Sequence, residues 1–359
     1  MNTPVKRPPV LPKPRPPLPT RTHDPREFIQ NFSFNNCKLG NQGFQRLLLQ
    51  LFGYAGHGKS SFINTCKIAW ENSAYSNYTK ASRSQGGDTM ERWTYKLTEN
   101  ITLVDNRGCT TMRSYEKGEI FAQLANLMPL DMKVDWCKGF GLASRILEAE
   151  PLVKASDFIV PILVYSVGYC PNPEEIKELE EILKTCREMT GVDATVVLTH
   201  KTKGHLKRME AIFRDMGTKY LYSLENYTPD NQSRSMEVDH SVMTFLYGVV
   251  RDAQFRVDYA RDPQKEMMER KVFVLKYIHN KVMETFELEL EAQNAMENVR
   301  MEQEMRIRRE EAEKQIKKEQ EEHENRIRDL EREFERQRLR NQYEHEQKIN
   351  VLQRIAKNK

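Results

Sequence analysis

The sequence predicts an α/β domain with a mostly parallel β-sheet and helices on both of its faces. Two observations support this fold class. Through the middle of the chain, apolar segments rich in Val, Leu and Ile alternate with amphipathic segments, which is typical of parallel sheets buried on both sides. One apolar segment also runs into a glycine-rich turn followed by an amphipathic segment, the order expected where a strand leads through a loop into a helix.

The expected elements follow from the spacing of apolar residues and from the turn residues between them. The expected strands are short apolar runs at 46–52, 92–97, 101–105, 158–165, 194–199 and 219–224. The expected helices carry apolar residues on one face and lie at 59–70, 118–127, 173–189, 205–216 and 238–255. Residues 128–156 fit neither pattern, and we interpret them as an insertion with some helix.

Composition divides the 359 residues into three regions. Residues 1–24 contain eight of the sixteen prolines and five basic residues against one acidic residue, so we expect a disordered, extended arm. Residues 262–359 contain 22 basic and 23 acidic residues and no glycine, which predicts a long helix or coiled coil. The folded domain is expected at 35–258. The net charge of +4 therefore originates in the arm, and the near-neutral domain argues against a protein that coats nucleic acid.

Other patterns exclude further classes of protein. No segment reaches the ~18 consecutive apolar residues of a transmembrane helix, so no transmembrane segment is expected. The N-terminus lacks the apolar core of a signal peptide, and we expect a cytoplasmic protein. The six cysteines are scattered without a Cys-x-x-Cys pair, which predicts free thiols in that compartment.

The strongest motif is Gly53-Tyr54-Ala55-Gly56-His57-Gly58-Lys59-Ser60, which fits the phosphate-binding pattern G-x-x-x-x-G-K-[ST]. Its glycines let the backbone curl so that successive N–H groups point at one phosphate, and the helix N-terminus adds a favourable dipole. The lysine is expected to reach the β- and γ-phosphates of a nucleotide, the first serine to ligate Mg²⁺, and the histidine to contribute its backbone. The loop residues expected to bind the nucleotide are Gly53, Gly56, His57, Gly58, Lys59, Ser60 and Ser61.

A second motif lies at the end of the apolar run 101–105. Asp105-Asn106-Arg107-Gly108 places a carboxylate directly after a predicted strand, 46 residues beyond Lys59. We expect Asp105 to hold Mg²⁺ through water. The Gly108 N–H is expected to meet the γ-phosphate and so to sense its presence.

These motifs and their order resemble the P-loop GTPases of the Ras-like, translation-factor-related class. The loop at 53–60 corresponds to their first motif and 105–108 to their third. The resemblance implies GTP or GDP and Mg²⁺ as cofactors, with Ser60, Asp105 and a threonine of the second motif as metal ligands. Thr89 fits that position and is also a candidate catalytic residue. Neighbouring alternatives for it are Ser82, Ser84 and Thr94.

The base-recognition motif departs from this pattern. These GTPases carry Asn/Thr-Lys-x-Asp after the corresponding strand, whereas this chain continues with Thr199-His200-Lys201-Thr202-Lys203. Such a variant resembles the immune-associated, AIG1-type GTPases and the plastid import receptors, in which a side chain stacks on the base. By this resemblance His200 or Lys201 covers the purine, with Thr199 and Asn226 beside it. Because the guanine-reading aspartate is missing, an ATP-using P-loop protein is an alternative.

The overall plan also resembles the interferon-induced 44-kDa family, which has an extended segment between the third motif and the following strand. The resemblance covers about 35–258.

Cys109 stands where many relatives carry a water-positioning glutamine, so we expect slow GTP hydrolysis, assisted by dimerisation or a partner. Candidate arginine fingers, each interpreted first as a structural charge, are Arg83, Arg107 and Arg113.

The two ends of the chain suggest partners. The arm contains two basic-x-x-Pro-x-x-Pro patterns, which suit either a plain tether or a ligand for an SH3-type domain. The tail is either a weak coiled coil or a single helix held by i,i+4 ion pairs. The sequence therefore predicts a guanine-nucleotide-binding switch that forms a homodimer or oligomer through its domain and tail. The alternative is a scaffold protein with a structural or degenerate nucleotide site.

Overall fold

The computed structural model describes residues 24–79, 91–112 and 114–357. Within them, seven strands form one sheet in the order β4-β2-β3-β1-β5-β6-β7. Strands β3, β1, β5, β6 and β7 are parallel, whereas β2 pairs antiparallel with both β3 and β4. The predicted α/β fold with a mostly parallel sheet is therefore confirmed. The strands are β1 (Arg46–Phe52), β2 (Glu91–Lys96), β3 (Ile101–Asp105), β4 (Met132–Lys133), β5 (Asp157–Ser166), β6 (Thr195–Thr199) and β7 (Leu221–Ser223).

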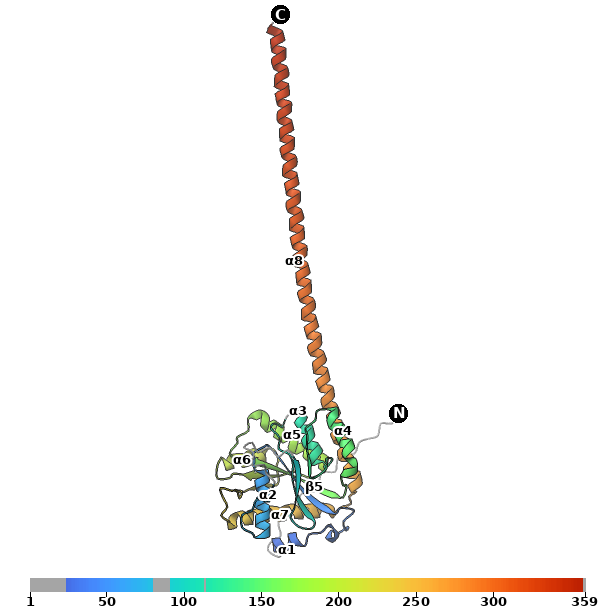
Figure 1. Cartoon of the computed structure of the whole chain (residues 1–359), viewed down its shortest axis with the longest axis vertical. Helices are drawn as coiled ribbons and strands as arrows, with labels where there is room; N and C mark the ends of the chain where they lie inside the picture. Colours follow the sequence, from blue (N-terminus) through green and yellow to red (C-terminus); the bar gives the residue numbers. More distant parts are fainter. Residues whose placement is uncertain (1–23, 80–90, 113, 358–359) are drawn as a thin grey trace. The chain divides into compact units, whose positions relative to one another are not determined.

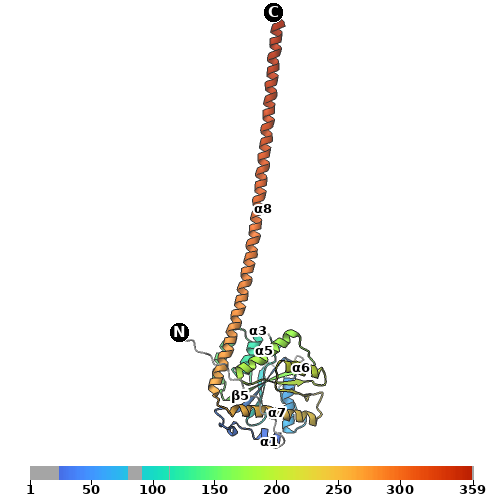
Figure 2. The same cartoon turned by 180° about the vertical axis from the view of Figure 1, so that it is seen from behind.

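Helices cover both faces of this sheet (Figures 1 and 2). Helices α1, α2 and α7 pack against one face and share one apolar core with it. Helices α3, α4, α5 and α6 and the first turns of α8 pack against the other face around a second core. The helices are α1 (Pro25–Gln30), α2 (Lys59–Glu71), α3 (Ser114–Leu124), α4 (Phe140–Ala149), α5 (Pro173–Thr190), α6 (Leu206–Asp215), α7 (Met236–Val257) and α8 (Pro263–Lys357).

The central strands supply side chains to both cores. In β1, Leu47, Leu49 and Leu51 lie in the core under α2 and α7, while Phe52 lies in the other core. Every residue of β3 and β6 is buried, as expected for parallel strands covered on both faces. Gln50 is a polar residue inside the otherwise apolar strand β1, and it is fully buried. Its side chain belongs to a polar network beside the candidate site.

The N-terminal part of the core was not predicted from the sequence. Helix α1 and a 3₁₀ turn at Phe34–Asn36 precede the first strand. Ile29 and Phe32 are buried there, and the ring of Phe34 packs 5.7 Å from that of Phe158 on β5. Short elements of this kind leave little periodic signal in a sequence, so their apolar residues did not distinguish a packed segment from a linker.

Residues 128–156, interpreted as an insertion, contain β4, α4 and a 3₁₀ turn at Glu150–Leu152. Strand β4 was not predicted because it has only two residues, both exposed.

All six cysteines lie in the described part of the chain, and each of them is a free thiol.

The predicted long C-terminal helix is present as α8, which is continuous from Pro263 to Lys357. Its first turns belong to the domain, because Val274 and Ile278 are buried in the second core. From Thr285 onward the helix is a separate unit, and every side chain from 283 to 352 is exposed. Among the described residues, no helix combines the length and the apolar character that crossing a membrane would require.

Candidate nucleotide-binding site

The predicted phosphate-binding loop joins β1 to α2, as expected from its motif. Gly53 has φ +139°, and a Cβ atom on it would lie 2.4 Å from the carbonyl oxygen of Val164 on β5. Gly58 has φ +89°, and a Cβ there would lie 2.9 Å from Nδ2 of Asn226. Only glycine avoids both the backbone strain and these contacts. The loop therefore has the tight curvature that phosphate binding at a helix N-terminus requires.

Lys59, the first residue of α2, extends back along this loop and is 6% exposed. Its Nζ atom donates to the carbonyl oxygens of Gly53 and Tyr54 at 3.1 and 2.9 Å. A Cβ on Gly108 would lie 2.9 Å from the same Nζ, so the backbone of the second motif passes directly beside the lysine. The Ala55 amide also donates to the carbonyl of Cys109 at 2.9 Å. The two motifs predicted to bind phosphate are thus in contact.

The predicted Mg²⁺ ligands Ser60 and Asp105 also meet. The Ser60 hydroxyl donates to Oδ2 of Asp105 at 2.5 Å. Asp105 is 2% exposed, and its Oδ1 atom is buried without a hydrogen-bond partner among the described residues. Burial raises the pKa of this carboxyl group, against the opposing effects of Lys59 and the Ser60 hydroxyl. A buried carboxylate oxygen without a partner requires an explanation, and a bound cation supplies one.

The donor atoms of this pair fit Mg²⁺, which prefers oxygen ligands and is commonly held by one or two protein groups together with phosphate oxygens. In the described part of the chain, no cluster of three or more His, Cys, Asp or Glu side chains is arranged to hold a metal. A metal at Ser60 and Asp105 would therefore rely on phosphate oxygens for its other ligands. Thr89, the third predicted ligand, lies outside the described residues, as do the alternatives Ser82 and Ser84.

On the base side of the loop, Thr199 is the last residue of β6 and Asn226 lies in the segment that follows β7. Both side chains contact the backbone of the phosphate-binding loop: Thr199 Oγ1 donates to the His57 carbonyl at 2.9 Å and Asn226 Nδ2 to the Gly58 carbonyl at 3.2 Å. The side chain of Thr65 on α2 lies 3.4 Å from Asn226 Oδ1. Thr199 and Asn226 were predicted as nucleotide contacts. In the structure they connect the end of β6 and the segment after β7 to the phosphate-binding loop.

His200 and Lys201 follow Thr199 in a turn. His200 has φ +55°, and its Nδ1 atom lies 3.1 Å from the hydroxyls of both Thr199 and Ser166. Lys201 forms an ion pair with Glu237 of α7. The carboxylate of Glu225 accepts hydrogen bonds from the amide and hydroxyl of Thr202 at 3.1 and 2.9 Å. Although the turn lacks the expected aspartate, it thus has a carboxylate from a neighbouring segment.

The ring of His57 lies within a cluster of tyrosines that sequence reasoning missed. Its centroid is 4.8 Å from that of Tyr165, 5.1 Å from that of Tyr54 and 5.7 Å from that of Tyr169. Its Nδ1 atom accepts from the Ser166 amide at 3.3 Å. Burial, followed by the nearby Lys59 and His200, lowers the pKa of His57 to about 4. The ring is therefore neutral at physiological pH and anchors the loop to the end of β5.

Of the residues considered for a role in hydrolysis, the structure describes Cys109 and Arg107. Cys109 is 1% exposed, and burial raises the pKa of its thiol to about 12, so it remains protonated. The guanidinium of Arg107 donates to the Val134 carbonyl at 2.6 Å and lies 5.0 Å from the ring of Trp136. Arg107 therefore contacts the insertion, consistent with its interpretation as a structural charge. Arg83 and Arg113 lie outside the described residues.

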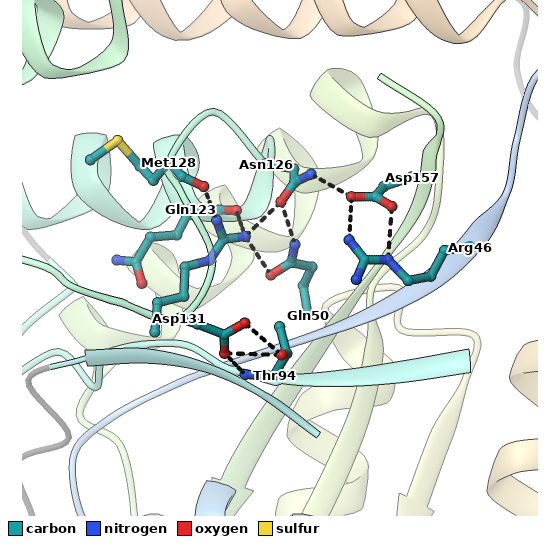
Figure 3. A network of polar contacts seen from close by, with 9 residues as sticks. Arg46, Gln50, Thr94, Gln123, Asn126, Met128, Asp131 and Asp157 are labelled. Atoms are coloured by element: carbon teal, nitrogen blue, oxygen red, sulfur yellow. Dashed lines mark hydrogen bonds and ion pairs between the residues drawn. The ribbon is translucent and has the colours of Figure 1, made fainter. Parts of the chain in front are cut away.

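A second feature that the sequence did not reveal is the buried guanidinium of Arg92 on β2. It donates hydrogen bonds to four residues that Figure 3 labels, namely Gln50, Gln123, Asn126 and Met128. Arg92 is fully buried. Its Nε atom donates to Asn106 Oδ1 at 2.8 Å, and its Nη2 atom donates to Gln50 Oε1 and Asn126 Oδ1, both at 3.0 Å. The guanidinium also donates to the carbonyls of Gln123 and Met128.

This network connects the second motif to the sheet and to the start of the insertion. Asn106 directly follows Asp105, and its Nδ2 atom donates to Gln50 on β1 at 3.0 Å. At the other end, Asn126 donates to Asp157, which accepts two hydrogen bonds from Arg46, each at 2.9 Å. Arg92 thus fixes the side chain that follows Asp105, and a single polar residue inside an apolar strand, Gln50, was its visible signal in the sequence.

No protein-family model and no curated protein matches this chain. A protein from Thermus thermophilus aligns with 49% of this chain at 14% identity and a TM-score of 0.29, and this chain spans only 22% of that protein. A second solved structure is described by the words "Dimerization is important for the GTPase activity of chloroplast translocon components atToc33 and psToc159". The alignment with it covers 60% of this chain and 86% of that chain, at 13% identity and a TM-score of 0.36.

Proposed function

We propose that this chain is a guanine-nucleotide-binding switch protein that binds GTP or GDP together with Mg²⁺. The observation that carries the proposal is the buried pair of Ser60 and Asp105, with one carboxylate oxygen lacking a partner among the described residues, beside Lys59 and Gly108. A lysine, a serine and a carboxylate at the N-terminus of one helix form the arrangement that holds a phosphate and its metal ion.

In this proposal each motif has a separate role. The backbone of the loop at 53–58 and the Lys59 ammonium bind the phosphates, whose negative charge the bound Mg²⁺ neutralises. Ser60 and Asp105 hold the metal, with Thr89 as the further ligand. Gly108 meets the γ-phosphate, because its backbone lies beside the lysine that reaches the same group.

The preference for guanine is the finer part of the proposal. His200 or Lys201 covers the purine, and Asn226 supports the loop beside it. The carboxylate of Glu225, held against Thr202, supports guanine over adenine, because an acidic acceptor can pair with the N–H groups of the guanine edge. Equal affinity for ATP would contradict this part and would favour the ATP-using alternative.

Hydrolysis is proposed to be slow in the isolated chain, because Cys109 is buried and protonated and Arg107 is directed to the insertion. A second copy or another protein would then supply the missing groups. We place the protein in the cytoplasm, with assembly through domain and tail and an SH3-type partner for the proline-rich arm. Residues 1–23 of this arm lie outside the described residues. The long exposed helix also fits the second candidate, a scaffold whose nucleotide site is structural.

A titration of the full chain with fluorescent GTP, GDP and ATP, with and without Mg²⁺, tests the proposal. The Lys59→Ala variant should bind GTP at least about tenfold more weakly, since a charge-assisted hydrogen bond contributes ~1.5–3 kcal/mol. Lys184→Ala, an exposed lysine on α5, is the matched control and should bind as the wild type does. Absence of binding, or binding that neither Mg²⁺ nor Lys59→Ala affects, would overturn the switch.

A further inference from the structure

The exposed part of α8 carries charge in two blocks of opposite sign. Residues 287–303 contain five acidic residues and one basic residue. Residues 336–352 contain four basic and two acidic residues, and 353–359 adds three basic residues and no acidic one. We refer to 287–303 as the acidic block and to 336–352 as the basic block. Residues 304–335 between them carry both signs in mixed order.

These two blocks cannot neutralise each other within one chain. Helix α8 is continuous, and the sequence after Pro263 contains neither proline nor glycine, so the helix has no residue at which it would fold back (Figure 1). At 1.5 Å per residue the block centres are about 70 Å apart, far beyond the ~8 Å screening length at physiological ionic strength. The separation of charge therefore acts only toward another molecule.

An apolar stripe runs along the same helix. Its members recur at intervals of 11 and 22 residues, as in Met305, Ile316, Ile327 and Ile349. An 11-residue repeat follows one face of a nearly straight helix, whereas a heptad pattern drifts across the surface. The side chains of this stripe are all exposed, and they are Met301, Met305, Ala312, Ile316, Ile327, Leu330, Phe334, Ile349 and Leu352.

We propose that α8 pairs with α8 of a second copy of this chain in antiparallel orientation, so that each acidic block lies against the basic block of the other copy. In the proposed alignment, the numbers of any two facing residues add up to 639. Residues 287–303 of one copy then face residues 336–352 of the other. The same alignment places Leu290 opposite Ile349 and Met305 opposite Phe334.

A parallel pair would place each block against its own copy, like charge against like charge. The mixed segment 304–335 faces itself in both orientations and does not discriminate between them. The charge blocks therefore select the antiparallel arrangement, while the apolar stripe supplies the contact. This inference deepens the assembly part of the proposed function and does not depend on nucleotide binding.

Cysteine cross-linking of the full chain tests the orientation, because the tail contains no cysteine. In a Cys137→Ser, Cys170→Ser background, which removes the two cysteines that are not buried, one copy carries Asn294→Cys and a second, size-tagged copy carries His345→Cys. Both positions lie on the stripe face, are exposed and face each other in the proposed alignment. A short bismaleimide then joins only neighbouring thiols, and the background chain alone is the control.

The mixture should give the cross-linked heterodimer at least tenfold more efficiently than either variant alone gives a homodimer. Reversing the basic block with Arg338→Glu and Arg340→Glu should reduce that product several-fold, and 1 M salt should weaken it in the same direction. Homodimer cross-links at position 294 or 345 would show a parallel pair and overturn the proposal. So would a chain that stays monomeric at micromolar concentration, a stable complex only with a different protein, or cross-linking that charge reversal leaves unchanged. Nucleotide titration of the same samples reports separately on the proposed switch.

Discussion

Replacing Arg92 with methionine tests whether the buried network next to the candidate metal site holds that site together. Methionine has a similar length and no hydrogen-bond donors, so it fills much of the space but removes all five hydrogen bonds of the guanidinium. Gln50, Asn106 and Asn126 would each lose a partner inside the protein. Arg92 is fully buried, and this burial lowers the pKa of its guanidinium to about 9.

The expected cost is large because the partner groups cannot turn to water. Removing one member of a buried, charged hydrogen-bond network typically costs about 3–5 kcal/mol. For a domain of this size each kcal/mol lowers Tm by about 2–4 °C, so Arg92→Met should lower Tm by roughly 6–20 °C. Arg92→Lys should also be destabilising, since a single ammonium cannot reproduce the fork of a guanidinium.

Differential scanning calorimetry and nucleotide titration of the same variants provide the measurement. Arg46→Lys is the matched control, because Arg46 lies at the far end of the network, is 30% exposed and, among the described residues, pairs only with Asp157. The lysine keeps a positive charge beside that buried carboxylate. Arg46→Lys should cost about 1–2 kcal/mol and leave Mg²⁺-nucleotide affinity unchanged. Arg92→Met should weaken that affinity even at temperatures well below the Tm of the variant. The reason is that Asn106, which follows Asp105, loses the hydrogen bond from Arg92 that holds its side chain.

Two results would refute this reasoning. An Arg92→Met domain as stable as the Arg46→Lys domain would show that the network relaxes without penalty or that water replaces the guanidinium. A destabilised domain with wild-type Mg²⁺-nucleotide affinity would show that Arg92 supports the fold but does not position Asp105.

Three further predictions concern the loop and the metal pair. Asp105→Asn should leave the Tm of the ligand-free protein unchanged or higher, since burial disfavours the charged carboxylate, yet should abolish the effect of Mg²⁺ on nucleotide affinity; Mg²⁺ dependence that persists would exclude Asp105 as a ligand. Gly58→Ala should cost about 1–2 kcal/mol from its left-handed backbone and the contact with Asn226, and should weaken phosphate binding, whereas wild-type values in both assays would argue against the strained loop. His57 has a folded-state pKa of about 4, below the 6.5 of the unfolded chain, so the unfolded state binds the proton first and stability falls as the pH is lowered through that window. In urea titrations, His57→Gln should lose about 3 kcal/mol less free energy of unfolding between pH 7 and pH 4 than the wild type does. A variant that loses as much stability as the wild type would assign the acid sensitivity to other groups.

Local sequence signals determined most of the fold. All six predicted strands and five predicted domain helices are present, because strand and helix periodicity and the glycines of the loop act over a few neighbouring residues. The meeting of Lys59, Ser60, Asp105 and Gly108 also followed from the sequence, since parallel strands place their carboxyl ends at one edge of the sheet.

The tertiary structure decided which distant side chains became partners. The sequence marked Thr199 and Asn226 as nucleotide contacts, and only the folded chain shows that they hold the loop backbone. Likewise, the choice of Arg92 as the partner of Asn106, and the direction of Arg107 toward the insertion, depend on where β2 and residues 128–149 lie. Hydrogen-bond partners far apart in the chain leave no periodic pattern, because packing brings them together, whereas strands, helices and the phosphate-binding loop are encoded by neighbouring residues.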